Sequence, residues 1–400
     1  MSASTRTKRI LLLVITCVLL GALAGCASAG SSSKSSEQSQ ASAPTSASAS
    51  VSASASASAS ASAASSSNAT LDGWVKDSKA LSSLVDFVSA SVDKNSPNYI
   101  PPEDRIAVFD MDGTLLGERF PTYFNDWLYI QRALYDESYQ APEELKAFAQ
   151  RWEDKVLRGM KFENFDEMER ELGPKLYEGL TVEEYQDVVR KFKAKPAWGF
   201  EGMTYGEAFF DPMVAVVEYL HDNGYTIYVN SATYRDAVRV MMEGTLDKWM
   251  PLDRVIGTDL LFKTSGQGDE STMDHTMKPD EDLQIEGDLF VKNQKTNKVQ
   301  AMEREIGKHP VLAFGNSSGD FAMANYALQN KEHPGQAYML LCDNTELDYG
   351  DPAVAEEFAA KCDAAGYHTV SMRDDWTTVY GNDVKKAESQ TGAEEQKKAA

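Results

Sequence analysis

The run Ile106–Leu115 constrains the fold of this chain more than any other stretch, because an apolar segment leads directly into two closely spaced acids. Its first four residues are apolar without interruption and too few for a helix, a pattern typical of a parallel strand buried on both faces. Asp110 and Asp112 follow, and side chains two apart on an extended chain point the same way. Gly113 then lets the backbone turn. The run predicts an α/β fold in which one carboxylate can attack a substrate and the other can move protons.

Two later segments repeat the pattern of an apolar run that ends in polar residues. Tyr225–Val229 is followed by Ser231, and Val311–Phe314 is followed by Asn316 and Asp320. A small hydroxyl at a strand end can hydrogen-bond a phosphoryl oxygen together with free backbone amides. In an open α/β sheet, ligands bind beyond the carboxyl ends of the strands. The three strand ends are therefore predicted to surround one site.

Two carboxylates this close repel each other, so the predicted site needs positive charge. A hard divalent cation with oxygen ligands, such as Mg²⁺, is the usual solution in proteins. The formal net charge of −22 adds to this need, because the overall field repels phosphate, nucleic acid and anionic lipid alike. We therefore expect no nucleic-acid partner, and we expect local cations to receive a phosphorylated substrate.

The D-x-D-G-T-L sequence that begins at Asp110 resembles the first motif of the haloacid dehalogenase (HAD) superfamily. Most members of that superfamily are phosphatases. The resemblance implies a Rossmann-like parallel sheet with an inserted helical cap. It also implies that Asp110 forms an aspartyl-phosphate, while Asp112 protonates the leaving alcohol and then deprotonates the attacking water. From Leu81 to Tyr380, the order of features is similar to a secreted, phosphoserine-phosphatase-like branch of these hydrolases.

The resemblance also implies a set of phosphate and metal contacts. Candidate phosphate-binding residues are Ser231, Gly113 and Lys298, with Lys295 as the alternative lysine. Candidate ligands of Mg²⁺ are Asp110, the backbone carbonyl of Asp112, Asn316 and Asp320. Asn316 departs from the acidic residue of the motif, so metal affinity would depend more on the two carboxylates. Ser231–Thr233 departs from the glycine-rich second motif of phosphoserine phosphatases, which leaves the substrate open beyond a small phosphorylated metabolite.

Residues 116–200 carry amphipathic helical patterns without a strand-like run, at 123–135, 142–157, 165–172 and 182–192. An insertion directly after the first strand lies at the carboxyl edge of the sheet, where a lid over the site would sit. We therefore predict a helical cap over 116–200 and an α/β core made of 71–115 and 201–382. A helical elaboration without a lid role is the alternative. The charged, Ala-rich end at 383–400 is predicted to be disordered.

The first 25 residues have the pattern of an export signal, with a basic start followed by the apolar run Ile10–Ala24. Leu23–Cys26 resembles a bacterial lipobox, which would be cleaved before Cys26 and would carry lipid on that residue. A plain signal peptide is the alternative. The Ser/Ala-rich stretch 26–70 has little apolar bulk to bury and is predicted to be a disordered tether. Together these features predict an extracytoplasmic head, anchored by lipid to the bacterial cell membrane.

Cysteine and histidine usage limits the other metal sites that the chain could form. Cys342 and Cys362 fall in the predicted core, where a disulfide could form in an oxidising compartment, and two buried free thiols are the alternative. The five histidines are scattered, and neither C-x-x-C nor H-E-x-x-H occurs. The sequence therefore argues against a zinc-type site.

Two other functions remain open. The segment 315–319 fits the G-x-S-x-G pattern of a serine hydrolase with Ser317 as nucleophile, and Asp343 or Asp351 followed by His368 gives a suitable chain order for a triad. A lipid-anchored binding protein without turnover is the other possibility, and Asn316 is the feature in its favour. Just after the first motif, Glu118 and Arg119 could contact a substrate or form an exposed ion pair.

Overall fold

The structure is a computed structural model, and residues 71–387 of it are described here. The predicted signal peptide, the lipid site at Cys26 and the tether over 26–70 lie outside the described residues. Within 71–387, no helix combines the length and the apolar character that crossing a membrane would require.

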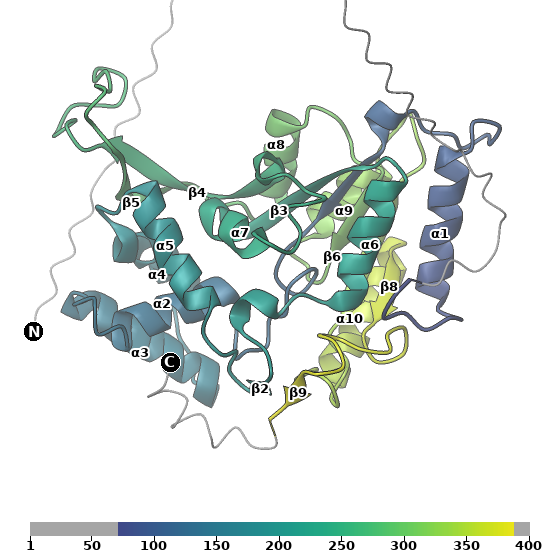
Figure 1. The fold of residues 1–400 in the computed structure, drawn as a ribbon, viewed down its shortest axis with the longest axis horizontal. Coiled ribbons are helices and arrows are strands. Elements are labelled where there is room, and N and C mark those ends of the chain that lie inside the picture. Colours follow the sequence, from purple (N-terminus) through teal and green to yellow (C-terminus); the bar gives the residue numbers. More distant parts are fainter. Residues whose placement is uncertain (1–70, 388–400) are drawn as a thin grey trace, which may run out of the picture. The chain divides into compact units, whose positions relative to one another are not determined.

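Seven strands form one sheet in the order β5-β4-β3-β1-β6-β7-β8 (Figure 1). All neighbouring strands are parallel except β4 and β5, which are antiparallel. The strands are β1 Ile106–Phe109, β3 Thr226–Tyr234, β4 Val255–Thr264, β5 Leu283–Val291, β6 Leu312–Gly315, β7 Gln336–Leu341 and β8 His368–Ser371. The predicted α/β fold with a Rossmann-like, mostly parallel sheet is confirmed.

Strand β1 lies at the centre of the sheet, between β3 and β6. All four of its residues are buried, as the uninterrupted apolar run predicted. Phe109 pairs in register with Val229 of β3 and with Phe314 of β6. The rings of Phe109 and Phe314 stack with their centroids 4.2 Å apart. Because the three strands are aligned at this level, the residues that follow them leave the sheet at the same edge.

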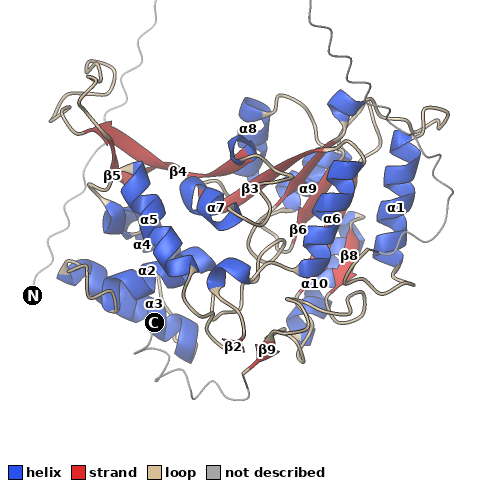
Figure 2. Ribbon diagram, in the orientation of Figure 1, coloured by secondary structure: helices blue, strands red, loops and turns tan. Residues whose placement is uncertain are grey.

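Helices cover both faces of the sheet (Figure 2). Alternate residues of β1 face opposite clusters of apolar side chains, since successive side chains of a strand point to opposite faces. Phe109 belongs to the cluster that includes α1 and α6, while Val108 belongs to the one that includes α8, α9 and α10. The flanking helices are α1 Lys79–Val92, α6 Asp211–Asp222, α7 Arg235–Met242, α8 Thr296–Glu305, α9 Phe321–Leu328 and α10 Pro352–Ala365.

The two cysteines of the core pack against different faces of the sheet. Cys342, just after β7, lies against the α1/α6 cluster, and Cys362 of α10 is buried in the opposite cluster. Both are free thiols. Of the two possibilities left open by the sequence, the structure therefore has the pair of thiols and not the disulfide.

Residues 116–200, called the helical segment below, contain four α-helices and a short 3-10 helix at Pro174–Tyr177. The α-helices are α2 Phe124–Leu134, α3 Glu143–Arg158, α4 Phe165–Leu172 and α5 Val182–Lys193, each within one residue of its predicted ends. Phe148, Trp152 and Phe165 form an aromatic cluster between α3 and α4, with the Trp152 and Phe165 centroids 5.0 Å apart. The segment is joined to the sheet because Gly179 N–H donates to the carbonyl of Ile285 in β5.

Strands β3 and β4 are longer than predicted. Strand β3 was expected to end at Val229 but continues to Tyr234, and its pairing with β4 is irregular between Asn230 and Tyr234. The residues 254–257 by themselves indicate only a short strand, but β4 extends to Thr264, because its second half pairs with β5. Figure 1 shows this pair extending beyond the rest of the sheet as a two-stranded arm. The partner strand β5 determines this extension, and the residues of β4 alone do not indicate it.

Both ends of the described part also differ from the prediction. The apolar spacing over 71–92 indicates one or two helices, and the structure has one α-helix there, α1, which begins at Lys79, where the Ser78 side chain accepts a hydrogen bond from the Leu81 N–H at 3.1 Å. The end was expected to be disordered from 383. In the structure, β9 Lys385–Lys386 pairs antiparallel with β2 Phe200–Glu201.

Candidate functional site

A buried lysine joins two of the predicted acids at the carboxyl edge of the sheet. Lys298 lies in the first turn of α8, and its Nζ donates to Asp110 Oδ1 at 2.7 Å and to Asp320 Oδ1 at 2.6 Å. The Lys298 side chain is 2% exposed and that of Asp320 is 1% exposed. Asp110 follows β1, whereas Asp320 follows β6 and caps α9. Three separate segments of the chain thus meet in one ion-paired cluster.

Burial and the charges of this cluster together shift the pKa values of Asp110 and Lys298. Burial raises the pKa of Asp110 to about 7, and the charge of Asp320 adds to this rise, while Lys298 acts against it. Burial alone would lower the pKa of Lys298, but Asp110 and Asp320 raise it above its ordinary value. The lysine therefore stays protonated, and the carboxylates around it outnumber the one positive charge.

One carboxylate oxygen of Asp112 accepts a hydrogen bond, and the other has no partner in the described part of the chain. Thr233 Oγ1 donates to Asp112 Oδ2 at 2.7 Å. Asp112 Oδ1 is buried and has no hydrogen-bond partner among residues 71–387. Burial raises the pKa of Asp112, while Thr233 and Lys298 act against this rise. A buried carboxylate with one free oxygen is suited to exchange a proton with a bound group.

Groups of the loop after β6 donate hydrogen bonds to the second carboxylate oxygen of Asp320. Asp320 Oδ2 accepts from the backbone N–H groups of Asn316 at 3.2 Å and Ser317 at 3.1 Å, and from Ser317 Oγ at 3.1 Å. Gly315 makes this approach possible, because a Cβ there would lie 2.5 Å from the Cβ of Asp320. The amide of Asn316 donates from Nδ2 to Glu118 Oε2 at 2.9 Å.

Gly113 allows the Asp110–Asp112 turn to pack against Asn316. Its φ is 73°, a conformation that side chains disfavour. A Cβ at this position would collide with Asn316 Nδ2 and would lie 2.6 Å from Glu118 Oε2. A side chain at this position would have to displace the side chains of Asn316 and Glu118.

We expect Gly113→Ala to lower the free energy of unfolding by about 2–4 kcal/mol, through left-handed strain and the collision together. Gly366→Ala is the matched control, because Gly366 has a φ of 79° but a Cβ added there would meet no atom within 4 Å. Urea unfolding of both variants measures the difference. Equal losses in the two variants would contradict the close packing of Gly113 against Asn316.

Two buried asparagines attach the lysine helix to the sheet, and the sequence analysis did not identify them. Asn293 Nδ2 donates to Asn230 Oδ1 at 2.7 Å and to the carbonyl of Ser231 at 2.8 Å. Asn230 Nδ2 in turn donates to the carbonyl of Lys298 at 3.1 Å. Asn230 and Asn293 are no more than 1% exposed. The position of Lys298 is therefore fixed by hydrogen bonds from β3 and from the segment after β5.

Of the predicted phosphate-binding residues, the structure brings Lys298 but not Lys295 to the acids. Lys295 is exposed and forms no ion pair within the described part of the chain. Ser231 lies at the expected edge of the sheet but is fully buried, and its hydroxyl accepts from the Thr233 N–H at 3.1 Å. It does not line the pocket, whereas Thr233 does. The expected direct contact of Ser231 with phosphate therefore lacks an open path in this structure.

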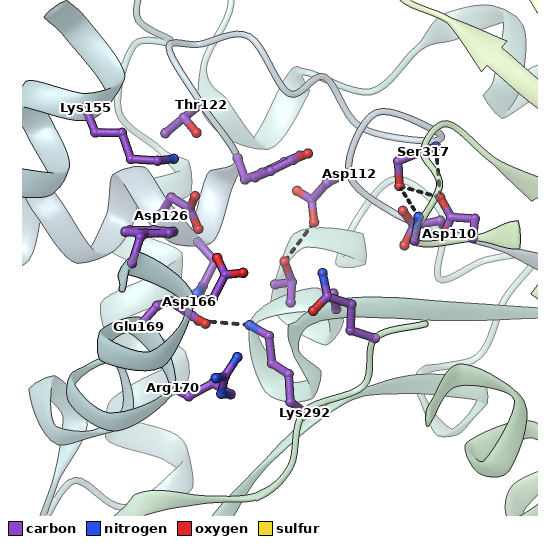
Figure 3. A pocket seen from close by; sticks show the side chains of 18 of the residues that line it. Asp110, Asp112, Thr122, Asp126, Lys155, Asp166, Glu169, Arg170, Lys292 and Ser317 are labelled. Carbon is purple, nitrogen blue, oxygen red and sulfur yellow. Dashed lines mark hydrogen bonds and ion pairs between the residues drawn. The ribbon is translucent and has the colours of Figure 1, made fainter. Parts of the chain in front are cut away.

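A pocket of about 790 Å³ lies over the acids (Figure 3). Its floor includes Asp110, Asp112 and Asp320, and its other wall comes from the helical segment and the end of β5. The charged residues of that wall are Asp126, Lys155, Asp166, Glu167, Glu169, Arg170 and Lys292. The volume lies within the range of sites that hold small molecules and exceeds the needs of a phosphate ion alone. The pocket therefore has room for the organic part of a substrate.

The wall opposite the acids carries charges of both signs. Lys292 Nζ donates to Glu169 Oε1 at 2.9 Å, which ties the end of β5 to α4. Asp126 of α2 also lines the pocket, and burial raises its pKa to about 8, with the charge of Glu169 adding to the rise. A substrate in this pocket would meet a polar wall beyond its phosphate group.

Glu118 and Arg119 do not line this pocket. Arg119 Nε lies 3.7 Å from Glu118 Oε1, and the Glu118 side chain is only 12% exposed. Burial raises the pKa of Glu118, while Arg119 and Asn316 act against this rise. Glu118 thus contacts the candidate metal ligand Asn316, which the sequence analysis did not foresee.

The residues of the possible serine hydrolase triad do not come together. His368 Nε2 lies 3.4 Å from Ser83 Oγ, and its ring stacks on Tyr338. Asp343 accepts from Ser371 Oγ at 2.6 Å, and Asp351 caps the start of α10. The hydroxyl of Ser317 is bound to Asp320. Neither aspartate is hydrogen-bonded to the histidine, and the histidine is bonded to Ser83 and not to Ser317, so the triad is not formed.

The oxygen atoms at this site fit a hard divalent cation. Within 71–387, no three His, Cys, Asp or Glu side chains converge on one point as a metal site. A cation would therefore need the backbone carbonyl of Asp112 and the amide oxygen of Asn316 in addition to the carboxylates of Asp110 and Asp320. Such an all-oxygen set suits Mg²⁺.

Comparison with solved structures finds distant similarity over most of the described fold. A conserved protein of unknown function from Anaerococcus prevotii DSM 20548 is 16% identical, covering 76% of this chain and 94% of that one, with a TM-score of 0.47. Cytosolic 5′-nucleotidase IIIB bound to cytidine is 16% identical, covering 74% and 84%, with a TM-score of 0.43. A phosphoserine phosphohydrolase-like protein from Francisella tularensis subsp. tularensis SCHU S4 is 12% identical, covering 59% and 87%, with a TM-score of 0.33.

None of the curated proteins matches the sequence. A family model does match, and its description is haloacid dehalogenase-like hydrolase. The match covers residues 107–325, which is more than half of the chain and extends from β1 into α9. It includes all the residues of the ion-paired cluster. The chain belongs to the haloacid dehalogenase-like hydrolase family.

Proposed function

We propose that this hydrolase is a Mg²⁺-dependent phosphomonoesterase that acts through an aspartyl-phosphate on a small phosphate ester. The observation that carries the proposal is the position of Lys298, whose ammonium group lies within 2.7 Å of Asp110 Oδ1 and Asp320 Oδ1 in the pocket that also contains Asp112. This arrangement supplies a nucleophile, a proton-transfer group and a fixed positive charge at one point. Phosphoryl transfer depends mainly on such positioning and charge stabilisation.

In the first step, a carboxylate oxygen of Asp110 attacks phosphorus, and the bond between phosphorus and the ester oxygen breaks. Asp112 gives its proton to the leaving alcohol, for which its unpartnered Oδ1 is available. Lys298 stays protonated and stabilises the negative charge on the phosphoryl oxygens. The products of this step are the free alcohol and a phosphoryl group bonded to Asp110.

In the second step, Asp112 takes a proton from a water molecule, and the resulting hydroxide attacks phosphorus. The bond from phosphorus to Asp110 breaks, which releases inorganic phosphate and restores the carboxylate. Mg²⁺, held by Asp110, the Asp112 carbonyl, Asn316 and Asp320, would supply further positive charge to the phosphoryl oxygens. Each residue returns to its starting protonation state.

The pocket wall supports a role of the helical segment as a cap over the substrate. Asp126, Glu169 and Arg170 come from this segment and line the same pocket as Asp110. We propose that the segment encloses the organic part of the ester and that its polar wall selects a polar leaving group. The export signal and lipid site read from residues 1–26 support an extracytoplasmic, membrane-anchored location as part of the same proposal.

Release of phosphate from p-nitrophenyl phosphate by the purified protein, with Mg²⁺ or with EDTA, tests the proposed function. We expect Mg²⁺-dependent release that Ser317→Ala does not abolish. Activity that survives EDTA but is lost in Ser317→Ala would favour the serine hydrolase. Absence of hydrolysis over a panel of phosphomonoesters would favour the binding protein.

Thr233 provides a second test of the role of Asp112. Thr233→Val removes the hydrogen bond to Asp112 Oδ2, and we expect kcat to fall about tenfold, since one such bond contributes on the order of 1–2 kcal/mol. Thr233→Ser keeps the hydroxyl and is the control, with kcat expected to stay near that of the original protein. A Thr233→Val variant with unchanged kcat would contradict the proposed positioning of Asp112.

A further inference from the structure

Asn316 occupies a position where the resemblance led us to expect an acid, and the structure places an acid directly behind it. We propose that Glu118 is a positioning residue that orients the Asn316 amide and supplies nearby the negative charge that Asn316 lacks. The inference rests on the metal site of the proposed function. It assigns to Glu118 a role in cation binding without direct contact with the cation.

The orientation of the amide follows from the chemistry of its partner. Asn316 Nδ2 donates to Glu118 Oε2 at 2.9 Å. An ionised carboxylate can only accept hydrogen bonds, so the amide must present its nitrogen to Glu118. No hydrogen bond to Asn316 Oδ1 is found within the described part of the chain. The oxygen is therefore left for a ligand, and Asn316 lines the pocket together with Asp110 and Asp320.

Packing fixes the Glu118–Asn316 pair against the first motif. Both side chains lie over Gly113, where a Cβ would collide with Asn316 Nδ2 and lie 2.6 Å from Glu118 Oε2. The motif itself forms a tight turn just before Glu118, because the Met111 carbonyl accepts from the N–H groups of both Leu115 and Leu116. Glu118 is thus held beside the backbone of the motif and has little freedom to leave Asn316.

The charge of Glu118 acts at short range. Coulomb attraction falls only with the first power of distance, so a carboxylate one hydrogen bond behind a ligand still attracts a cation. Arg119 Nε lies 3.7 Å from Glu118 Oε1 and offsets part of this charge. Groups that orient metal ligands in this way commonly change metal affinity by about 10–100-fold when they are replaced.

Two substitutions at position 118 test the orienting hydrogen bond and the negative charge of Glu118 separately. Glu118→Gln keeps an acceptor for Asn316 Nδ2 but removes the charge. Glu118→Asp keeps the charge but shortens the reach to Asn316. With affinity for Mg²⁺ measured by calorimetry on the full-length protein, we expect each variant to bind Mg²⁺ about 10-fold or more weakly than the original protein. Thermal unfolding without Mg²⁺ establishes that each variant is folded.

The double variant Glu118→Gln/Asn316→Asp moves the acid from position 118 to position 316 and keeps one hydrogen bond between the two side chains. We expect it to recover the Mg²⁺ affinity that Glu118→Gln loses. Asn316→Asp alone places two carboxylates in contact. We expect this single change to raise the Mg²⁺ affinity less than the same change does in the Glu118→Gln variant. Residues in contact are often non-additive, so the recovery of Mg²⁺ affinity in the double variant is the result that a purely structural role of Glu118 does not produce.

Direct measurement of Mg²⁺ affinity separates this inference from the proposed function. Coupling between positions 118 and 316 in a protein that hydrolyses no phosphomonoester would support the inference and refute the function. Mg²⁺-dependent hydrolysis with an affinity unchanged in Glu118→Gln and Glu118→Asp would overturn the inference alone. Additive effects in the double variant would also overturn it. Failure of the original protein to bind Mg²⁺ would overturn both.

Discussion

Asp110→Asn is expected to reduce phosphatase turnover by at least about 10⁴-fold, because an amide cannot replace the carboxylate as nucleophile. The side chain keeps its size and can still contact Lys298, so the loss should not come from unfolding. Steady-state release of p-nitrophenol, together with the unfolding midpoint of the same preparation, measures both properties. We expect the rate to fall to background while the midpoint changes little.

Asp112→Asn gives a matched comparison at the second acid of the motif. p-Nitrophenolate is a good leaving group and needs little protonation, so Asp110 can still be phosphorylated in this variant. Hydrolysis of the aspartyl-phosphate then lacks its base. We expect a burst of one equivalent of p-nitrophenol followed by slow turnover in Asp112→Asn, and no burst in Asp110→Asn. Substantial turnover in Asp110→Asn would exclude Asp110 as the nucleophile.

Lys298→Met is expected to lower both stability and activity. It leaves the carboxylates of Asp110 and Asp320 buried without the ammonium group that lies between them. Breaking a buried ion pair by removing one partner costs about 3–5 kcal/mol of unfolding free energy. The loss of a fixed charge beside the phosphoryl group is expected to lower kcat by about 10²–10³-fold. Urea unfolding and kcat at saturating p-nitrophenyl phosphate measure the two effects.

Lys295→Met is the matched control, because Lys295 is exposed and lies just before the helix that carries Lys298. We expect a stability change within about 0.5 kcal/mol and an unchanged kcat, as for most surface substitutions. Loss of activity in Lys295→Met, with activity retained in Lys298→Met, would reverse the assignment of the two lysines.

The sequence was informative where a short local pattern determines the outcome. The apolar run before Asp110 predicted the central strand, and the i, i+2 spacing of Asp110 and Asp112 placed both in one pocket. The helical periodicity of 116–200 predicted four helices to within one residue, since each buries one apolar face. These features depend on the spacing of neighbouring residues and need no knowledge of distant partners.

The features that the sequence did not reveal depend on contacts between distant segments. Glu118 bonds to Asn316, and Asn293 bonds to Asn230, across large separations in the chain. Polar residues of these types are common in loops, so nothing in the local pattern distinguishes them. The same reason applies to Thr233, which faces the pocket because β3 continues past Ser231. The extra length of β3 follows from its pairing with β4, which a local pattern cannot show.

The central claim is that Asp110 becomes phosphorylated, and trapping the intermediate tests it most directly. Asp112→Asn protein is mixed with a phosphomonoester and Mg²⁺, quenched in acid and digested, and the peptides are examined by mass spectrometry. The account predicts one phosphoryl group on the peptide that contains Asp110, which hydroxylamine treatment removes. A phosphoryl group found on Ser317 instead, or a fully active protein that never carries one on Asp110, would contradict the account.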